Sequence, residues 1–192
     1  MLYLNKPIQP HIIVPLSDVQ RDGVKRLDNE DFGPVIRKTC EHLQERGSVA
    51  SDEMMQNGIM ALKQYYLVAL LDPLNAHAVS RIVDEFWHAH ILHTREYSSF
   101  CEDFIGAFMH HVPLDKSSSS MVSNVSDLYS YTLTILPQLF DNVDDRMWSS
   151  ADTTEALICY HFGNTVSYPR VANDAHFPVH PKGSMWSFEN VA

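Results

Sequence analysis

The sequence predicts a mainly α-helical protein of about five helices, with extended N- and C-terminal arms and at most a short N-terminal strand. Two observations support this prediction. Between residues 31 and 163, apolar side chains recur at helical spacing, and helix start and stop signals bound the stretches that carry them. Residues 1–30 and 164–192 lack that periodicity. We therefore expect an N-terminal arm, a helical domain and a C-terminal arm with these bounds.

The composition favours a globular protein with a substantial apolar core. Hydrophobic residues make up 45% of the 192 residues and charged residues 20%. The formal net charge of −10 repels phosphate backbones and acidic membrane surfaces, so we expect neither nucleic acid nor membrane as a partner. Three widely spaced cysteines suit a reducing compartment, and the N-terminus lacks a signal-peptide pattern. We expect a cytoplasmic protein.

Within the N-terminal arm, the stretch "HIIVPL" is rich in β-branched residues and bounded by Pro10 and Pro15. This pattern predicts a short edge strand. The following stretch, "SDVQRDGVKRLDNED", is polar, and we expect a loop.

The first two helices have clear boundary signals. Pro in the first turn and Gly47 after the last predict a helix over Pro34–Arg46. Ser51 can cap a second helix, and the acidic residues after it favour the helix N-terminus. That helix should end before Pro73, because proline disfavours helical geometry in the residue preceding it.

Three more helices are expected downstream. The third starts near Ser80 and either continues to about Met109 or breaks near Cys101. The fourth covers about Val122–Leu136, after a soft serine-rich linker. The fifth covers Thr153–Phe162 and has a capping-box spacing at its start.

The third predicted helix carries an unusual stretch, "DEFWHAHILHTREYSSFC", in which three histidines fall within six residues. At about 100° per residue, His90, His93, Tyr97 and Cys101 share one stripe of a helix, whereas His88 lies on another side. Imidazole and thiolate groups suit zinc, iron or copper. The sequence therefore suggests a metal site on this stripe.

A second segment is needed to complete such a site, and "MHHVP" supplies two further histidines before a proline. If the chain turns back there, these histidines return toward the stripe. The candidate metal ligands are His90, His93, Cys101, His110 and His111. We expect three neighbouring residues to support the ligands rather than to bind the ion: Asp84, His88 and Tyr97.

An ordinary buried helix explains the same stretch without a metal. Helix faces that carry Phe, Tyr, Cys and His often belong to the core, with each histidine hydrogen-bonded. His88 follows Asp84 by one helical turn, and this spacing fits an intrahelical hydrogen bond better than ligation by either residue.

The segment "VDEFWHAHILHTREYSSFCEDFIGAFMHHVP" resembles the motif of the glycine-rich-domain-containing-like proteins. This chain has His93 where that family tends to have Asp, and Ile105 where it tends to have Phe. The resemblance covers roughly thirty residues and implies a helical body with a His/Cys site, but no particular reaction. The matching positions are Asp84, Trp87, His88, His90, Ile91, Leu92, Thr94, Tyr97, Cys101, Gly106, His110, His111 and Pro113.

The first function hypothesis is a non-catalytic structural or assembly protein with a His/Cys metal site. Its arms would bind protein partners in an oligomer or a larger assembly such as a virion. Few solvated tails carry large aromatic residues, so Phe177, Trp186 and Phe188 are the candidate partner-binding residues.

The alternative is a small enzyme that depends on iron, zinc or copper bound at His90, His110 and His111. Tyr97 or Asp84 would then serve as acid or base. A third possibility is a helical interaction domain whose histidines are simply buried. An enzyme needs a pocket that reaches the histidines, whereas a structural metal site is closed.

Overall fold

The protein is mainly α-helical, as the sequence predicts. The computed structural model describes residues 5–106, 108–112, 114, 116–150, 158–162 and 174–178. The described residues form six α-helices, a short 3-10 helix and one small sheet. The helices are η1 (Gln9–His11), α1 (Asp18–Asn29), α2 (Gly33–Glu45), α3 (Asp52–Leu71), α4 (Arg81–Ile91), α5 (Thr94–Phe104) and α6 (Ser119–Leu139).

Helix α3 is the centre of the core. Every residue from 61 to 71 is buried, and the helix packs against α1, α4 and α6. Its boundaries follow the sequence signals. The side chain of Ser51 accepts a hydrogen bond from the backbone N–H of Met54, and the helix ends at Leu71, two residues before Pro73. The prediction for this helix is confirmed.

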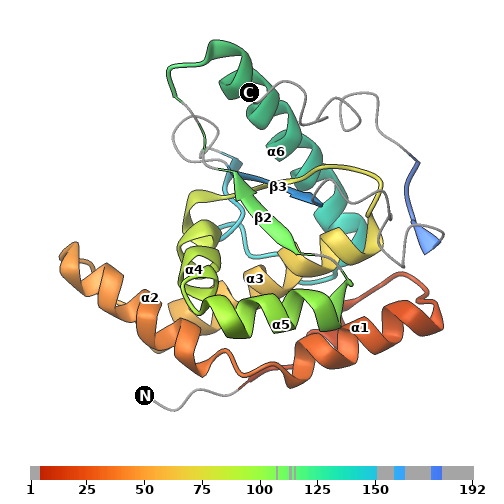
Figure 1. Ribbon diagram of the computed structural model, residues 1–192, viewed down its shortest axis with the longest axis horizontal. Helices are drawn as coiled ribbons and strands as arrows, with labels where there is room; N and C mark the ends of the chain where they lie inside the picture. The colour runs from red at the N-terminus through yellow and green to blue at the C-terminus, as the bar shows by residue number, and fades with distance from the viewer. Residues whose placement is uncertain are drawn as a thin grey trace.

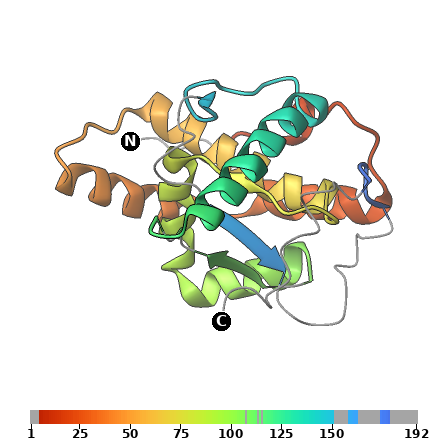
Figure 2. The same cartoon turned by 90° about the horizontal axis from the view of Figure 1, so that it is seen from above.

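The sheet has three antiparallel strands in the order β1-β3-β2. It lies between α6 on one side and the α4–α5 pair on the other (Figures 1 and 2). The predicted fifth helix is wrong over its last residues, because 158–162 form the central strand and not a helix. The rest of that prediction, 153–157, lies outside the described residues. The strands are β1 (Ala78–Val79), β2 (Met109–Val112) and β3 (Ile158–Phe162).

The third predicted helix is divided into α4 and α5. The division falls at His93, whose φ of −85° and ψ of 61° are not helical, and so comes well before Cys101. Helix α5 ends where Gly106 adopts a φ of 77°, a left-handed conformation that glycine tolerates best. Because of the division, Tyr97 and Cys101 lie on a different helix from His88.

The loop predicted for the polar stretch after Pro15 is wrong, because Asp18–Asn29 form α1. Ser17 and Gln20 make a reciprocal capping box at its start. Val24 and Leu27 are buried on the inner face, and the charged residues except Asp28 lie outside. The predicted edge strand is reduced to a single bridge between Ile12 and Phe140.

A buried ion pair ties the N-terminal residues to α3. The side chain of Lys63 is fully buried, and its Nζ lies 3.0 Å from Oδ1 of Asp28 and 2.9 Å from the carbonyl oxygen of Lys6. Asp28 also accepts hydrogen bonds from the backbone N–H groups of Ile8 and Gln9. Residues 6–9 are therefore fixed to the body of the protein.

Residues 174–178 return to the start of α1. Ser17 donates to the Asp174 carboxylate at 2.8 Å, and the Gln20 amide donates to the Asp174 carbonyl oxygen at 2.8 Å. Phe177 is partly buried against the chain's own core. No helix among the described residues combines the length and the apolar character that a bilayer crossing requires.

Candidate metal centre

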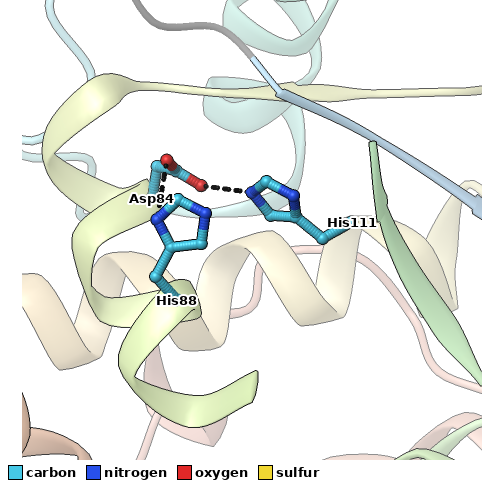
Figure 3. A group of neighbouring side chains, drawn as sticks. All are labelled: Asp84, His88 and His111. Atoms are coloured by element: carbon cyan, nitrogen blue, oxygen red, sulfur yellow. Dashed lines mark hydrogen bonds and ion pairs between the residues drawn. The ribbon is translucent and has the colours of Figure 1, made fainter. Parts of the chain in front are cut away.

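The residues best placed to hold a metal ion are Asp84, His88 and His111. Asp84 and His88 project from α4, and His111 projects from β2 toward them (Figure 3). The carboxylate of Asp84 lies between the two imidazoles: Oδ1 is 3.2 Å from Nε2 of His111, and Oδ2 is 3.3 Å from Nδ1 of His88. The three candidate ligand atoms all lie within 4.8 Å of one another.

Helical spacing brings the first two residues together. Asp84 and His88 are four residues apart, so their side chains lie on the same face of α4, one turn apart. The side chain of Ser80 caps the helix by accepting from the backbone N–H of Val83, and it donates to the carbonyl oxygen of Met147. The start of α4, and with it Asp84, is therefore anchored.

Strand alternation decides which histidine of the "HH" pair joins them. Successive side chains of a strand point to opposite sides. In β2, Met109 is fully buried and the His111 side chain is only 13% exposed, whereas His110 is exposed and rests against Phe108. Of the two histidines, only His111 reaches Asp84.

The cluster is buried at its base and open at one corner. The Asp84 side chain is 8% exposed and that of His88 is 45% exposed. Burial lowers the pKa of His88, and the neighbouring His111 lowers it further, while the Asp84 charge acts in the opposite direction. The ring of Trp87 lies 4.9 Å from that of His111, and the rings of His88 and His111 are 4.3 Å apart, measured between centroids. The lowered pKa of His88 favours its neutral form, which is the form that binds a metal ion.

The donor separations can be compared with those of a tetrahedral metal site. Bonds of about 2.0–2.1 Å in a tetrahedral site put neighbouring donor atoms roughly 3.3 Å apart. Each imidazole lies at about this distance from the Asp84 carboxylate, His111 at 3.2 Å from Oδ1 and His88 at 3.3 Å from Oδ2. The contacts are thus made with different oxygens of the same carboxylate. Without a metal, the contact of His111 with Asp84 is a hydrogen bond, in which the imidazole N–H donates to the carboxylate.

His90, a predicted ligand, lies on the other side of α4. It is 2% exposed, and its Nδ1 lies 2.8 Å from the hydroxyl oxygen of Tyr66. Burial, with a smaller contribution from His93, lowers the pKa of His90 to about 3. The contacts of His90 are those of a neutral, hydrogen-bonded core histidine.

The other predicted ligands are also separate from the cluster. His93 precedes α5, and its Nε2 is buried without a hydrogen-bond partner among the described residues. Cys101 is a buried thiol whose pKa is raised to about 11, chiefly by burial. His110 is exposed. Of the five predicted ligands, the structure therefore brings only His111 together with Asp84 and His88, both of which were expected to play supporting roles.

The sequence predicted a contact between Asp84 and His88, and the two side chains do meet, as an ion-pair contact of 3.3 Å. Sequence reasoning gave Asp84 a supporting role, because an aspartate four residues before a histidine is commonly its hydrogen-bond partner on a helix. Its contact with His111 depends on how β2 is placed against α4, and no local pattern reports that placement.

Of the predicted partner-binding residues, only Phe177 is described, and it packs on the chain's own core. Trp186 and Phe188 lie outside the described residues. The terminal aromatics therefore remain candidates for partner binding, with one of the three accounted for by an intramolecular contact.

Fold and site together define a mainly α-helical protein with a His/Asp cluster between a helix and an edge strand. The family model described as UCP032817-like matches residues 25–134. Because the match covers more than half of the chain, the chain belongs to the UCP032817-like family, and Asp84, His88 and His111 all lie inside the matched stretch. No curated protein and no solved structure matches the chain. The resemblance to the glycine-rich-domain-containing-like proteins remains a prediction.

Proposed function

We propose that this protein binds one divalent transition-metal ion through Asp84, His88 and His111. The observation that carries the proposal is the convergence of a buried carboxylate and two imidazoles from α4 and β2, with donor atoms no more than 4.8 Å apart. Two imidazoles and one carboxylate form a donor set that zinc and iron(II) sites use, and imidazole also suits copper.

The charge of the site supports a cation. Asp84 is the only negatively charged member, and the two imidazoles can bind an ion only when they are neutral. Burial lowers the pKa of His88 and so favours its neutral form. A bound dication would add its charge next to the buried carboxylate and so offset the cost of burying Asp84.

A metal-dependent enzyme is the second candidate. Three protein ligands leave a coordination position free, and the partial exposure of His88, 45%, supports access from solvent to the cluster. Catalytic zinc and iron sites share this pattern, because the free position holds a water molecule whose pKa the metal lowers. Closed structural sites, by contrast, use four protein ligands.

The assembly role predicted from the terminal segments remains a separate prediction. A metal site that joins α4 to β2 is compatible with it, because such an ion would fix a helix and a strand that are distant in the sequence. Light scattering of the purified protein tests this role directly, since a monomer at all accessible concentrations would contradict it.

Metal titration with matched histidine variants tests the metal site. Protein prepared without a His tag would be stripped with a chelator and titrated with Zn²⁺, Fe²⁺ under argon, and Cu²⁺. We expect about one ion per chain for at least one metal. His111→Ala should weaken binding by more than the roughly 100-fold that the loss of an outer hydrogen-bond partner costs. His110→Ala, the adjacent exposed histidine, should leave binding unchanged.

Two results would overturn the metal site: no stoichiometric binding of any of the three metals, or equal losses in the His110 and His111 variants. The enzyme candidate has its own readout in the Co²⁺-substituted protein. An open coordination position predicts that azide changes the visible Co²⁺ spectrum, whereas a closed four-ligand site predicts an unchanged spectrum.

A further inference from the structure

The hydroxyl group of Tyr97 links the two elements that carry the candidate metal ligands. Tyr97 lies on α5, is 1% exposed, and contributes none of the three donors. Its hydroxyl accepts a hydrogen bond from Nε1 of Trp87 at 3.0 Å and donates one to the carbonyl oxygen of Met109 at 2.7 Å. Trp87 immediately precedes His88 on α4, and Met109 lies two residues before His111 on β2.

The carbonyl group of Met109 needs this partner. Among the described residues β2 is an edge strand, since the sheet order is β1-β3-β2 and none of these residues forms a strand on its outer side. Met109 is fully buried, so water cannot satisfy its backbone. Cys101, one turn after Tyr97 on α5, receives a backbone hydrogen bond from Met109. Two side chains of α5 thus contact the backbone of this one residue.

Because side chains alternate along a strand, the placement of Met109 also decides on which side of β2 the His111 side chain lies. Both side chains lie on the inner side of β2, two residues apart, so a strand fixed at Met109 holds His111 on the side that faces Asp84. Trp87 makes a second contact with this arrangement, because its ring packs against the imidazole of His111. The same indole therefore contacts both Tyr97 and a candidate ligand.

We infer that Tyr97 is a positioning residue for the metal site: by bonding to Trp87 and Met109 at once, its hydroxyl holds β2 against α4 so that His111 meets Asp84 and His88. The inference rests on the proposed function where it concerns the metal. The sequence predicted that Tyr97 supports the ligands, and the inference specifies the two hydrogen bonds through which it would do so.

The chain offers a matched control. Tyr129 on α6 is also buried, and its hydroxyl donates a hydrogen bond of 2.9 Å to the backbone carbonyl oxygen of Ser149. Tyr97→Phe and Tyr129→Phe therefore each remove one hydroxyl that bonds to the backbone. Only the first change removes a bond to the strand of His111. Circular dichroism would confirm that both variants are folded.

The first readout is metal affinity. We expect Tyr97→Phe to weaken metal binding by about tenfold, as is typical when a hydrogen bond behind a ligand is removed. Tyr129→Phe should bind as tightly as the unaltered protein. Equal binding by both variants and the unaltered protein would overturn the inference while leaving the metal site intact. Equal losses in both variants would also overturn it, because the cause would then be general destabilisation.

The second readout needs no metal. In metal-free protein, the imidazole signals of His111 in ¹H–¹⁵N long-range NMR spectra report its hydrogen bond to Asp84. Tyr97→Phe should shift these signals, and Tyr129→Phe should not. If the unaltered protein binds no metal, the proposed function fails, but the NMR comparison still decides whether Tyr97 positions His111. Unchanged His111 signals in Tyr97→Phe would overturn the inference.

Discussion

Asp84 and His111 are separated by 27 residues in the chain, yet the carboxylate of one lies 3.2 Å from the imidazole of the other. The contact joins α4 to β2, which are separated in the chain by α5 and the turn that follows it. Asp84 also meets His88 at 3.3 Å, so one buried carboxylate orients two imidazoles. These relationships make the electrostatics of the cluster directly testable, because each partner has a defined influence on the pKa of His88.

Asp84→Asn and His111→Ala should move the pKa of His88 in opposite directions. The negative charge of Asp84 raises this pKa, so its removal should lower the value further. His111 lowers the pKa of His88, so its removal should raise the value. NMR titration of metal-free protein between pH 4 and 8 would measure both shifts. Shifts of the same sign in the two variants would contradict the geometry of the cluster.

His90 should make the protein less stable as the pH falls. In the unfolded chain its pKa is near 6.5, and in the folded protein it is about 3. Between these two pH values the unfolded chain binds a proton at His90 that the folded protein does not bind. The free energy of unfolding is therefore unaffected by this residue above pH 6.5 and decreases as the pH falls toward 3. The slope is at most about 1.4 kcal/mol per pH unit.

Urea unfolding at pH 7, 6 and 5 would measure that slope. In His90→Gln the slope should be smaller than in the unaltered protein, because the titrating group is gone. His110→Gln is the matched control, since His110 is exposed and should leave the slope unchanged. A slope in His90→Gln as steep as in the unaltered protein would show that other groups cause the acid sensitivity.

Gly58→Ala should destabilise the contact between α3 and α4. A Cβ atom at Gly58 would collide with the ring of Phe86, which is fully buried. The forced repacking should cost about 1–3 kcal/mol of unfolding free energy, measured by urea denaturation. Combining it with Phe86→Leu, which makes room for the methyl group, should give less than the sum of the two single costs. Additive costs would contradict direct contact.

Asp28→Ala should destabilise the protein far more than Lys63→Met. Burial lowers the pKa of Lys63, and the Asp28 carboxylate beside it counteracts that shift. Removing Asp28 leaves a buried ammonium without its counter-ion and should cost about 3–5 kcal/mol. Removing the Lys63 charge instead leaves a partly exposed carboxylate that still accepts from the N–H groups of Ile8 and Gln9, and should cost less. Thermal denaturation would rank the two variants.

Helices with local boundary signals were predictable from the sequence. Ser51 and Pro73 frame α3, and the start of α4 near Ser80 was also expected. These signals act within one turn, so a single sequence contains them. Helix α1 was missed because its stripe of Val24 and Leu27 is narrow among many charged residues, and burial against α3 outweighs that polarity.

The sheet was not predictable in the same way. β3 pairs with β1 and β2, which are distant in sequence, and its residues also fit a short helix in isolation. The site depends on this sheet. Sequence analysis found the histidine-rich region but assigned the stripe of His90 as the metal face. The side chain of Tyr66 satisfies His90 instead, and strand alternation selects His111 over His110.

The stretch that the family shares, residues 25–134, contains every member of the Asp84 cluster but lacks β3, the strand that pairs with β2. It also lacks Ser17, whose hydroxyl binds Asp174, and Ile12, which pairs with Phe140. Residues before the shared stretch thus contact residues that follow it. A protein cut to residues 25–134 would therefore keep Asp84, His88 and His111 but lose the strand that pairs with β2, and we expect it to fold less cooperatively than the full chain.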